Sequence, residues 1–85
     1  MNKREFYKEL KNIGFTQISL CTGEKTNYFF IDLPNIRLVI DRCRLYFRDV
    51  KDDNWINNIF IKEISIDDKS IKSLKKIIEF LGVEK

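Results

Sequence analysis

Arginine is the residue type in this chain whose spacing points most directly to chemistry. Four of the five arginines fall between Ile36 and Val50, in the segment IRLVIDRCRLYFRDV, where apolar and aromatic residues separate them. A guanidinium group binds carboxylates and phosphates through directed hydrogen bonds, and it stacks on aromatic rings. The segment therefore indicates a binding surface, and no catalytic or cofactor motif surrounds it.

Metal, redox and acid–base chemistry are not expected from the other residues. The chain has no histidine, and its two cysteines, Cys21 and Cys43, lack the close spacing of metal or redox pairs. We expect both to be buried or half-buried thiols. The acidic stretch 49–54, DVKDDN, lacks the glycine and the final glutamate of a calcium loop, so it is predicted to be a turn. We therefore expect no enzyme activity, no metal and no cofactor.

Length and composition bound the class of protein. Eighty-five residues make one domain, residues 1–85, with a thin but adequate core. The net charge of +3 permits nucleic-acid or acidic-protein partners without requiring either. No apolar run approaches the roughly 18 residues that span a bilayer, and the start of the chain, MNKREFYKEL, lacks the apolar core of a secretion signal. The protein is expected to be soluble and cytoplasmic, with no membrane partner.

Residues 2–13 are predicted to form an amphipathic helix, because their apolar residues recur at helical spacing. Asn2 is the expected N-cap, and Gly14 suits a left-handed exit. Four basic residues lie on other faces of this helix: Lys3, Arg4, Lys8 and Lys11. We interpret these four as a solvated surface and not as a binding site.

Alternating apolar residues then predict two antiparallel strands, over residues 16–21 and 27–33, joined by a polar turn. A turn at Pro34-Asn35 leads into the next strand. In the resulting hairpin apolar residues oppose apolar residues, for example Phe29 opposite Ile40, which supports the pairing.

The next strand contains a one-residue slip in its alternation at Asp41-Arg42. Its apolar residues have even numbers up to Ile40 and odd numbers from Cys43 onward. A β-bulge in one long bent strand and a two-residue turn, which would pair Ile40 with Cys43, both account for the slip. The bulge is favoured because Asp-Arg lacks the glycine that two-residue hairpin turns prefer.

The rest of the chain is predicted to form one more strand and a helix. Residues 55–66 have the pattern of an extended segment with a second bulge or bend near Lys62-Glu63, and Trp55 is expected in the core or at its edge. Asp67 or Asp68 is the expected N-cap of the last helix. The predicted buried stripe of this helix comprises Ile71, Leu74, Ile78 and Leu81, and Ile77 and Phe80 are expected to widen it.

This order of elements predicts an α+β fold: an N-terminal helix, a meandering antiparallel sheet of about four strands and a C-terminal helix (α-β-β-β-β-α). Two helices cover only one sheet face, so the opposite face is expected to be uncovered and rich in arginine and aromatic residues. The candidate binding residues on it are Tyr28, Phe30, Arg37, Arg42, Arg44, Tyr46 and Arg48.

That face is compatible with an ordinary solvated surface, a protein interface or a site for single-stranded nucleic acid. Asp32, Asp41 and Asp49 lie among the arginines and lower the positive potential that phosphate binding exploits, which favours a protein partner. We expect a small non-enzymatic protein that binds a host or cellular protein, with single-stranded nucleic acid as the alternative ligand. A homodimer is a further possibility. Ile, Lys and Asn are abundant, a bias that often reflects an A+T-rich coding sequence. Small size and this A+T-rich composition suggest a phage or mobile-element inhibitor, for instance of a host defence nuclease.

Overall fold

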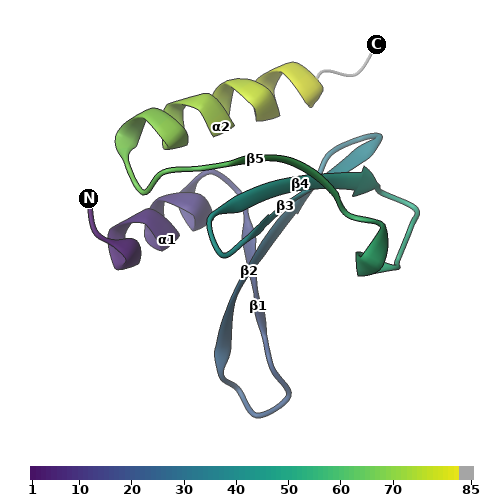
Figure 1. Cartoon of the computed structure of the whole chain (residues 1–85), viewed down its shortest axis with the longest axis horizontal. Coiled ribbons are helices and arrows are strands. Elements are labelled where there is room, and N and C mark those ends of the chain that lie inside the picture. The colour runs from purple at the N-terminus through teal and green to yellow at the C-terminus, as the bar shows by residue number, and fades with distance from the viewer. Residues whose placement is uncertain (83–85) are drawn as a thin grey trace.

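The chain folds as helix, antiparallel meander and helix, which confirms the predicted α+β class (Figure 1). The computed structural model describes residues 1–82, with every side chain among them except that of Trp55. The helices are α1 (Lys3–Asn12) and α2 (Asp68–Leu81). The strands, which neighbour one another in chain order, are β1 (Thr16–Ser19), β2 (Lys25–Asp32), β3 (Ile36–Asp41), β4 (Arg44–Asp49) and β5 (Ile59–Glu63).

The ends of α1 follow the sequence signals. The side chain of Asn2 accepts a hydrogen bond from the backbone N–H of Glu5 at 2.8 Å, as an N-cap does. Gly14 leaves the helix at a φ of +115°, and a Cβ at this position would lie 3.1 Å from the Cδ1 of Ile31. The positive φ therefore favours glycine, and a Cβ would also crowd the tip of the Ile31 side chain on β2.

The slip near Asp41 is a turn, and the favoured bulge was wrong. Arg42 and Cys43 both have positive φ, 52° and 63°, as the central residues of a type I′ hairpin turn do. Asp41 pairs with Arg44, so the turn lies one residue later than the alternative interpretation placed it, and Ile40 faces Leu45 instead of Cys43. One predicted strand thus becomes two, which raises the count from four to five.

The segment before β5 was also predicted incorrectly. Residues 55–57 form a short 3-10 helix, η1 (Trp55–Asn57), because the Asn54 side chain accepts from the backbone N–H of Ile56 and turns the chain. The Trp55 side chain, predicted to lie in the core or at its edge, is outside the part of the molecule that the structure describes. A bulge does interrupt β5, since Leu45 pairs with Lys62 while Tyr46 pairs with Phe60, which leaves Ile61 as the extra residue.

One hydrophobic core joins both helices to the same face of the sheet. Its buried residues are Phe6, Leu10, Phe15, Phe29, Leu38, Ile40, Leu45, Ile64, Ile71 and Leu74. Asp67 caps α2 by accepting from the backbone N–H of Ser70 at 2.9 Å, and this fixes the start of the helix over the sheet. The β1–β2 hairpin extends away from this core, and its tip lies far from both helices (Figure 1).

Candidate interaction surface

The sheet face opposite the helices, called the far face below, holds its side chains in three rows set by strand register. The central row consists of Thr16, Phe30, Val39, Tyr46 and Phe60. One flanking row consists of Asp32, Arg37 and Arg48, and the other of Tyr28, Asp41, Arg44 and Glu63. Six of the seven predicted binding residues therefore share this face, and the seventh, Arg42, lies in the turn beside it.

Arg37 is engaged within the molecule. Its Nε and Nη2 donate to the two carboxylate oxygens of Asp32, at 2.5 and 2.9 Å. Its guanidinium also lies 4.7 Å from the centre of the Phe30 ring. The hydrogen bonds from Arg37 hold the pKa of Asp32 below its usual value and raise the pKa of Arg37. Asp32 thus takes two of the five N–H donors of Arg37, and the guanidinium group covers the Phe30 ring.

Arg48 is buried, with only 4% of the residue exposed. Its Nε and Nη1 are enclosed and have no hydrogen-bond partner among the residues that the structure describes. Its charge helps to lower the pKa of Asp32, after the larger effect of Arg37, and that of Asp52, after the hydrogen bonds from Asn54 and Asn57. Arg48 is therefore an internal cation near carboxylates and not a surface residue.

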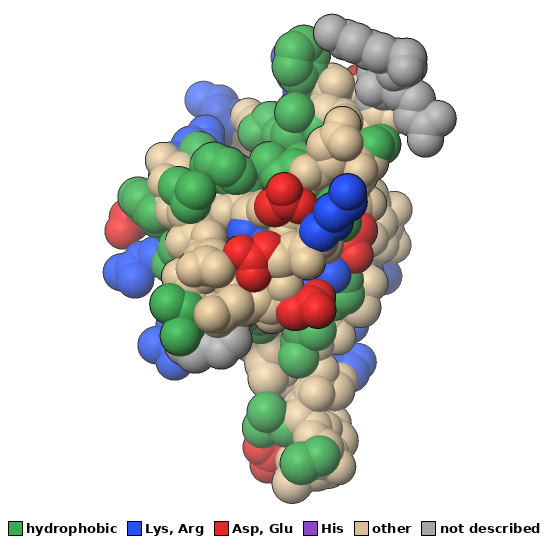
Figure 2. All heavy atoms as spheres, turned by 90° about the vertical axis from the view of Figure 1, so that its right-hand side faces the viewer, with side chains coloured by type: hydrophobic (Ala, Val, Ile, Leu, Met, Phe, Trp, Pro, Cys, Tyr) green, Lys and Arg blue, Asp and Glu red, His purple; other side chains and the backbone are tan. Residues whose placement is uncertain are grey.

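The far face is only partly open, contrary to the expectation of an uncovered surface. Val39 at its centre is fully buried. The β4–β5 connection closes over this region, and the Nδ2 of Asn58 reaches the hydroxyl of Tyr28 at 3.5 Å, the limit of a hydrogen bond. Figure 2, which faces the end of the molecule where this connection lies, shows acidic and basic side chains intermixed there. Such mixing gives no extended positive surface.

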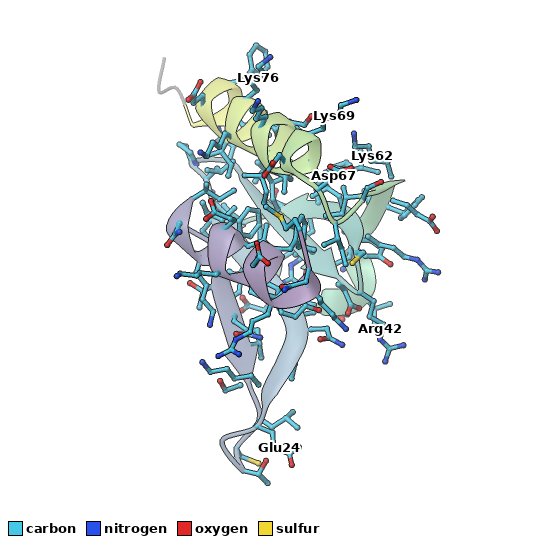
Figure 3. The ribbon with its side chains drawn as sticks, turned by 90° about the vertical axis from the view of Figure 1, so that its left-hand side faces the viewer. Glu24, Arg42, Lys62, Asp67, Lys69 and Lys76 are labelled. Atoms are coloured by element: carbon cyan, nitrogen blue, oxygen red, sulfur yellow. The ribbon has the colours of Figure 1, made fainter. Side chains whose placement is uncertain are left out.

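The two arginines near the β3–β4 turn are exposed. Arg42 occupies the turn, and Figure 3 shows it pointing away from the body of the molecule. Arg44 lies 3.7 Å from Glu63 on β5, and both side chains are more than half exposed, so water weakens this ion pair. These guanidinium groups remain available to a partner.

The most unusual exposed group lies on the edge strand β5 and on η1 just before it, and it was not predicted from the sequence. Ile56, Ile59, Phe60 and Ile61 are 69, 54, 51 and 44% exposed, and together they are called the β5 edge below. Phe60 also packs edge-on against Tyr46, with 5.7 Å between ring centres. The signal in the sequence was the run Ile59-Phe60-Ile61, because consecutive strand residues cannot all face one core.

The cysteines are not joined to each other. Cys43 is half-buried against the core, as expected for a thiol, whereas Cys21 is exposed near the tip of the β1–β2 hairpin, which corrects its predicted burial. Among residues 1–82, no three histidine, cysteine or acidic side chains lie close enough together to hold a metal ion.

Within the described part of the chain, neither helix is both long and apolar enough to cross a bilayer. Comparison with protein-family models, with curated proteins and with solved structures finds no match to this chain.

Proposed function

We propose that this chain is a small non-enzymatic binding protein that acts through protein–protein contact, and that the β5 edge is its contact surface. The observation that carries the proposal is the exposure of three large apolar side chains on the edge strand β5 and of a fourth, Ile56, in η1 just before it. Large exposed apolar residues that are close neighbours along a strand at the edge of a sheet are typical of interaction sites in proteins.

The position of these residues on an edge strand gives the contact a defined geometry. An edge strand has alternate backbone N–H and C=O groups without a strand partner, so an extended segment of another protein can add to the sheet. Proteins commonly protect such edges with charged residues. In β5 the charged residues, Lys62 and Glu63, lie at the end of the strand, after Ile59, Phe60 and Ile61. Complete burial of the four side chains would contribute roughly 3 to 6 kcal/mol, because each is already about half-buried.

Part of the predicted arginine and aromatic site adjoins the β5 edge. Tyr46 pairs with Phe60 and Arg44 pairs with Glu63, so both lie on the strand next to β5. The turn that contains Arg42 is tied to the end of β5 by the hydrogen bond from Ile64 N–H to Cys43 C=O, at 2.9 Å. Tyrosine and arginine beside an apolar centre supply directed hydrogen bonds to a partner.

The alternative ligand for the far face, single-stranded nucleic acid, draws less support from this geometry. Phosphate binding there needs free guanidinium groups, and base stacking needs open aromatic faces. Arg37 is paired with Asp32 and covers Phe30, while Arg48 is buried.

The test compares proteins captured from the native host by three forms of the chain. The double variant Ile59→Lys, Ile61→Lys places charges on the β5 edge and is expected to lose the partner that the unmodified chain captures. Phe80→Lys is the control, because Phe80 on α2 lies outside the β5 edge and is 81% exposed, contrary to the prediction that it widens the buried stripe of this helix. Capture of the same protein by the double variant at undiminished yield would contradict the proposal.

Two further measurements refine the identity of the partner. Sedimentation of the purified chain is expected to show a monomer, and a dimer that the double variant dissociates would identify a second copy of the chain as the partner. The more specific proposal, a phage or mobile-element inhibitor of a host defence nuclease, rests on small size and A+T-rich composition. It predicts that a captured nuclease loses cleavage activity when the purified chain is added.

A further inference from the structure

An open groove of about 1010 Å³ lies between α1 and the base of the β1–β2 hairpin, on a different surface from the β5 edge. Nine residues line it: Lys3, Arg4, Glu5, Tyr7, Lys8, Lys11, Gln17, Lys25 and Asn27. The groove combines the basic face of α1, interpreted from sequence as merely solvated, with a lysine contributed by β2. The fold therefore collects cations that are far apart in the chain.

The charge of this groove exceeds that of the whole protein. Its lining holds five cations and one carboxylate, a net charge of +4, whereas the entire chain carries +3. All remaining residues together therefore sum to −1. A concave surface lined by one sign of charge concentrates its field and attracts ligands of the opposite sign.

Two of the lysines lie close enough to repel each other. The pKa of Lys11 is lowered first by contact with the Lys25 side chain, then by desolvation, and to a smaller extent by repulsion from the charge of Lys25. An anion placed between the two ammonium groups would relieve this repulsion. The groove thus gains more from an anionic ligand than isolated surface lysines do.

The lining residues favour phosphate groups over an acidic protein segment. Protein interfaces are depleted in lysine and depend on buried apolar or aromatic anchors. The groove contains no aliphatic residue, and its one aromatic ring, Tyr7, is already packed 4.8 Å from Phe29 while its hydroxyl donates to Asn27 at 2.8 Å. No ring is free to stack on a nucleobase, so the contacts would be to the backbone of a nucleic acid.

The α2 side of the molecule provides an internal comparison. It carries as many lysines as the groove has cations, yet four carboxylates lie among them. The lysines are Lys62, Lys69, Lys72, Lys75 and Lys76, and the carboxylates are Glu63, Asp67, Asp68 and Glu79. Figure 3 shows Asp67 between β5 and α2, near Lys62 and Lys69. The number of lysines alone therefore does not single out the groove, but its net charge does.

We propose that the groove between α1 and β2 binds the phosphate backbone of nucleic acid without reading base sequence. This second site does not depend on the protein-binding role of the β5 edge. It would allow the chain to engage a protein partner and the nucleic acid bound to that partner at the same time.

The test is a fluorescence anisotropy titration with two 20-base-pair DNA duplexes of unrelated sequence, between about 50 and 200 mM salt. Contact with about four phosphates predicts that the logarithm of the affinity falls against the logarithm of the salt concentration with a slope of about −3.6. The variant Lys11→Gln, Lys25→Gln is expected to make this slope less steep by about 1.8 and to weaken binding about tenfold or more at 100 mM salt.

The matched control is Lys69→Gln, Lys72→Gln, which removes the same charge from α2 and is expected to retain the slope and most of the affinity. Equal losses in the two variants would show binding by net charge alone and would overturn the proposal. So would the absence of binding at 50 mM salt, or a clear difference in affinity between the two duplexes. All four substituted lysines are exposed, so both variants are expected to keep the fold. Thermal unfolding of each variant checks this.

Discussion

Replacement of Arg48 by methionine is expected to stabilise the protein. Burial of an N–H donor without a partner costs about 1 to 3 kcal/mol, and Arg48 contributes two such donors, Nε and Nη1. Methionine has a similar length and no polar hydrogen. The attraction of Arg48 to Asp32 and Asp52 would be lost, but Asp32 keeps its bonds from Arg37, and Asp52 keeps those from Asn54 and Asn57. We therefore expect a net gain of about 1 to 2 kcal/mol in the free energy of unfolding.

The assay is thermal and urea unfolding at pH 7, followed by circular dichroism. A gain of 1 kcal/mol raises the Tm of a domain of this size by about 4 to 8 °C. Arg48→Glu is the opposing variant and is expected to lose several kcal/mol, because it buries a third carboxylate near Asp32 and Asp52. A loss of 1 kcal/mol or more in the methionine variant would refute the reasoning and would mean that the guanidinium holds the β4–β5 connection in place. Nuclear magnetic resonance titration should show a higher pKa for both aspartates once Arg48 is gone.

Three other substitutions test the local structure. In urea titrations, Gly14→Ala should lower the free energy of unfolding more than Gly23→Ala. Both glycines have positive φ, but only at Gly14 would a Cβ meet another residue, Ile31. Equal losses would contradict this close contact with Ile31. Arg42→Asn with Cys43→Gly should raise stability by about 1 kcal/mol in the same assay, since Asn-Gly favours the type I′ turn, and a loss would contradict that turn. Asp67→Ala should lower Tm at pH 7. The backbone N–H of Ser70 holds the pKa of Asp67 below its usual value, so the contribution of the charged cap is present above the unfolded-state pKa and is lost as the pH falls through the lowered folded-state pKa. A Tm difference that does not shrink as the pH is lowered through the acid range would contradict the cap.

Local signals in the sequence were sufficient for most of the fold. The spacing of apolar residues located both helices, and Asn2 and Asp67 act as N-caps as predicted. The turn at Arg42-Cys43 was missed because neither residue favours positive φ, and long-range strand pairing imposes a conformation that local preference disfavours. The alternation of apolar residues contained the slip but could not assign it to a turn.

The candidate site was less predictable because it depends on what covers each side chain. Alternation placed six of the predicted residues on one face correctly, yet Arg48 and Arg44 occupy that same face with opposite exposure. The β4–β5 connection lies near Arg48 and not near Arg44, and loop paths have no periodic signal. The basic groove required Lys25 to meet Lys11 across the fold, which depends on tertiary packing.

Hydrogen–deuterium exchange of the chain, alone and with its captured partner, tests the role of the β5 edge most directly. Strand addition engages the free backbone N–H groups of β5, so exchange over residues 59–63 is expected to slow in the complex while exchange at the tip of the β1–β2 hairpin stays unchanged. The Ile59→Lys, Ile61→Lys variant should show no such protection under the same conditions. Unchanged exchange over residues 59–63 in a saturated complex, with protection at another segment instead, would contradict the assignment of β5 as the protein-binding surface.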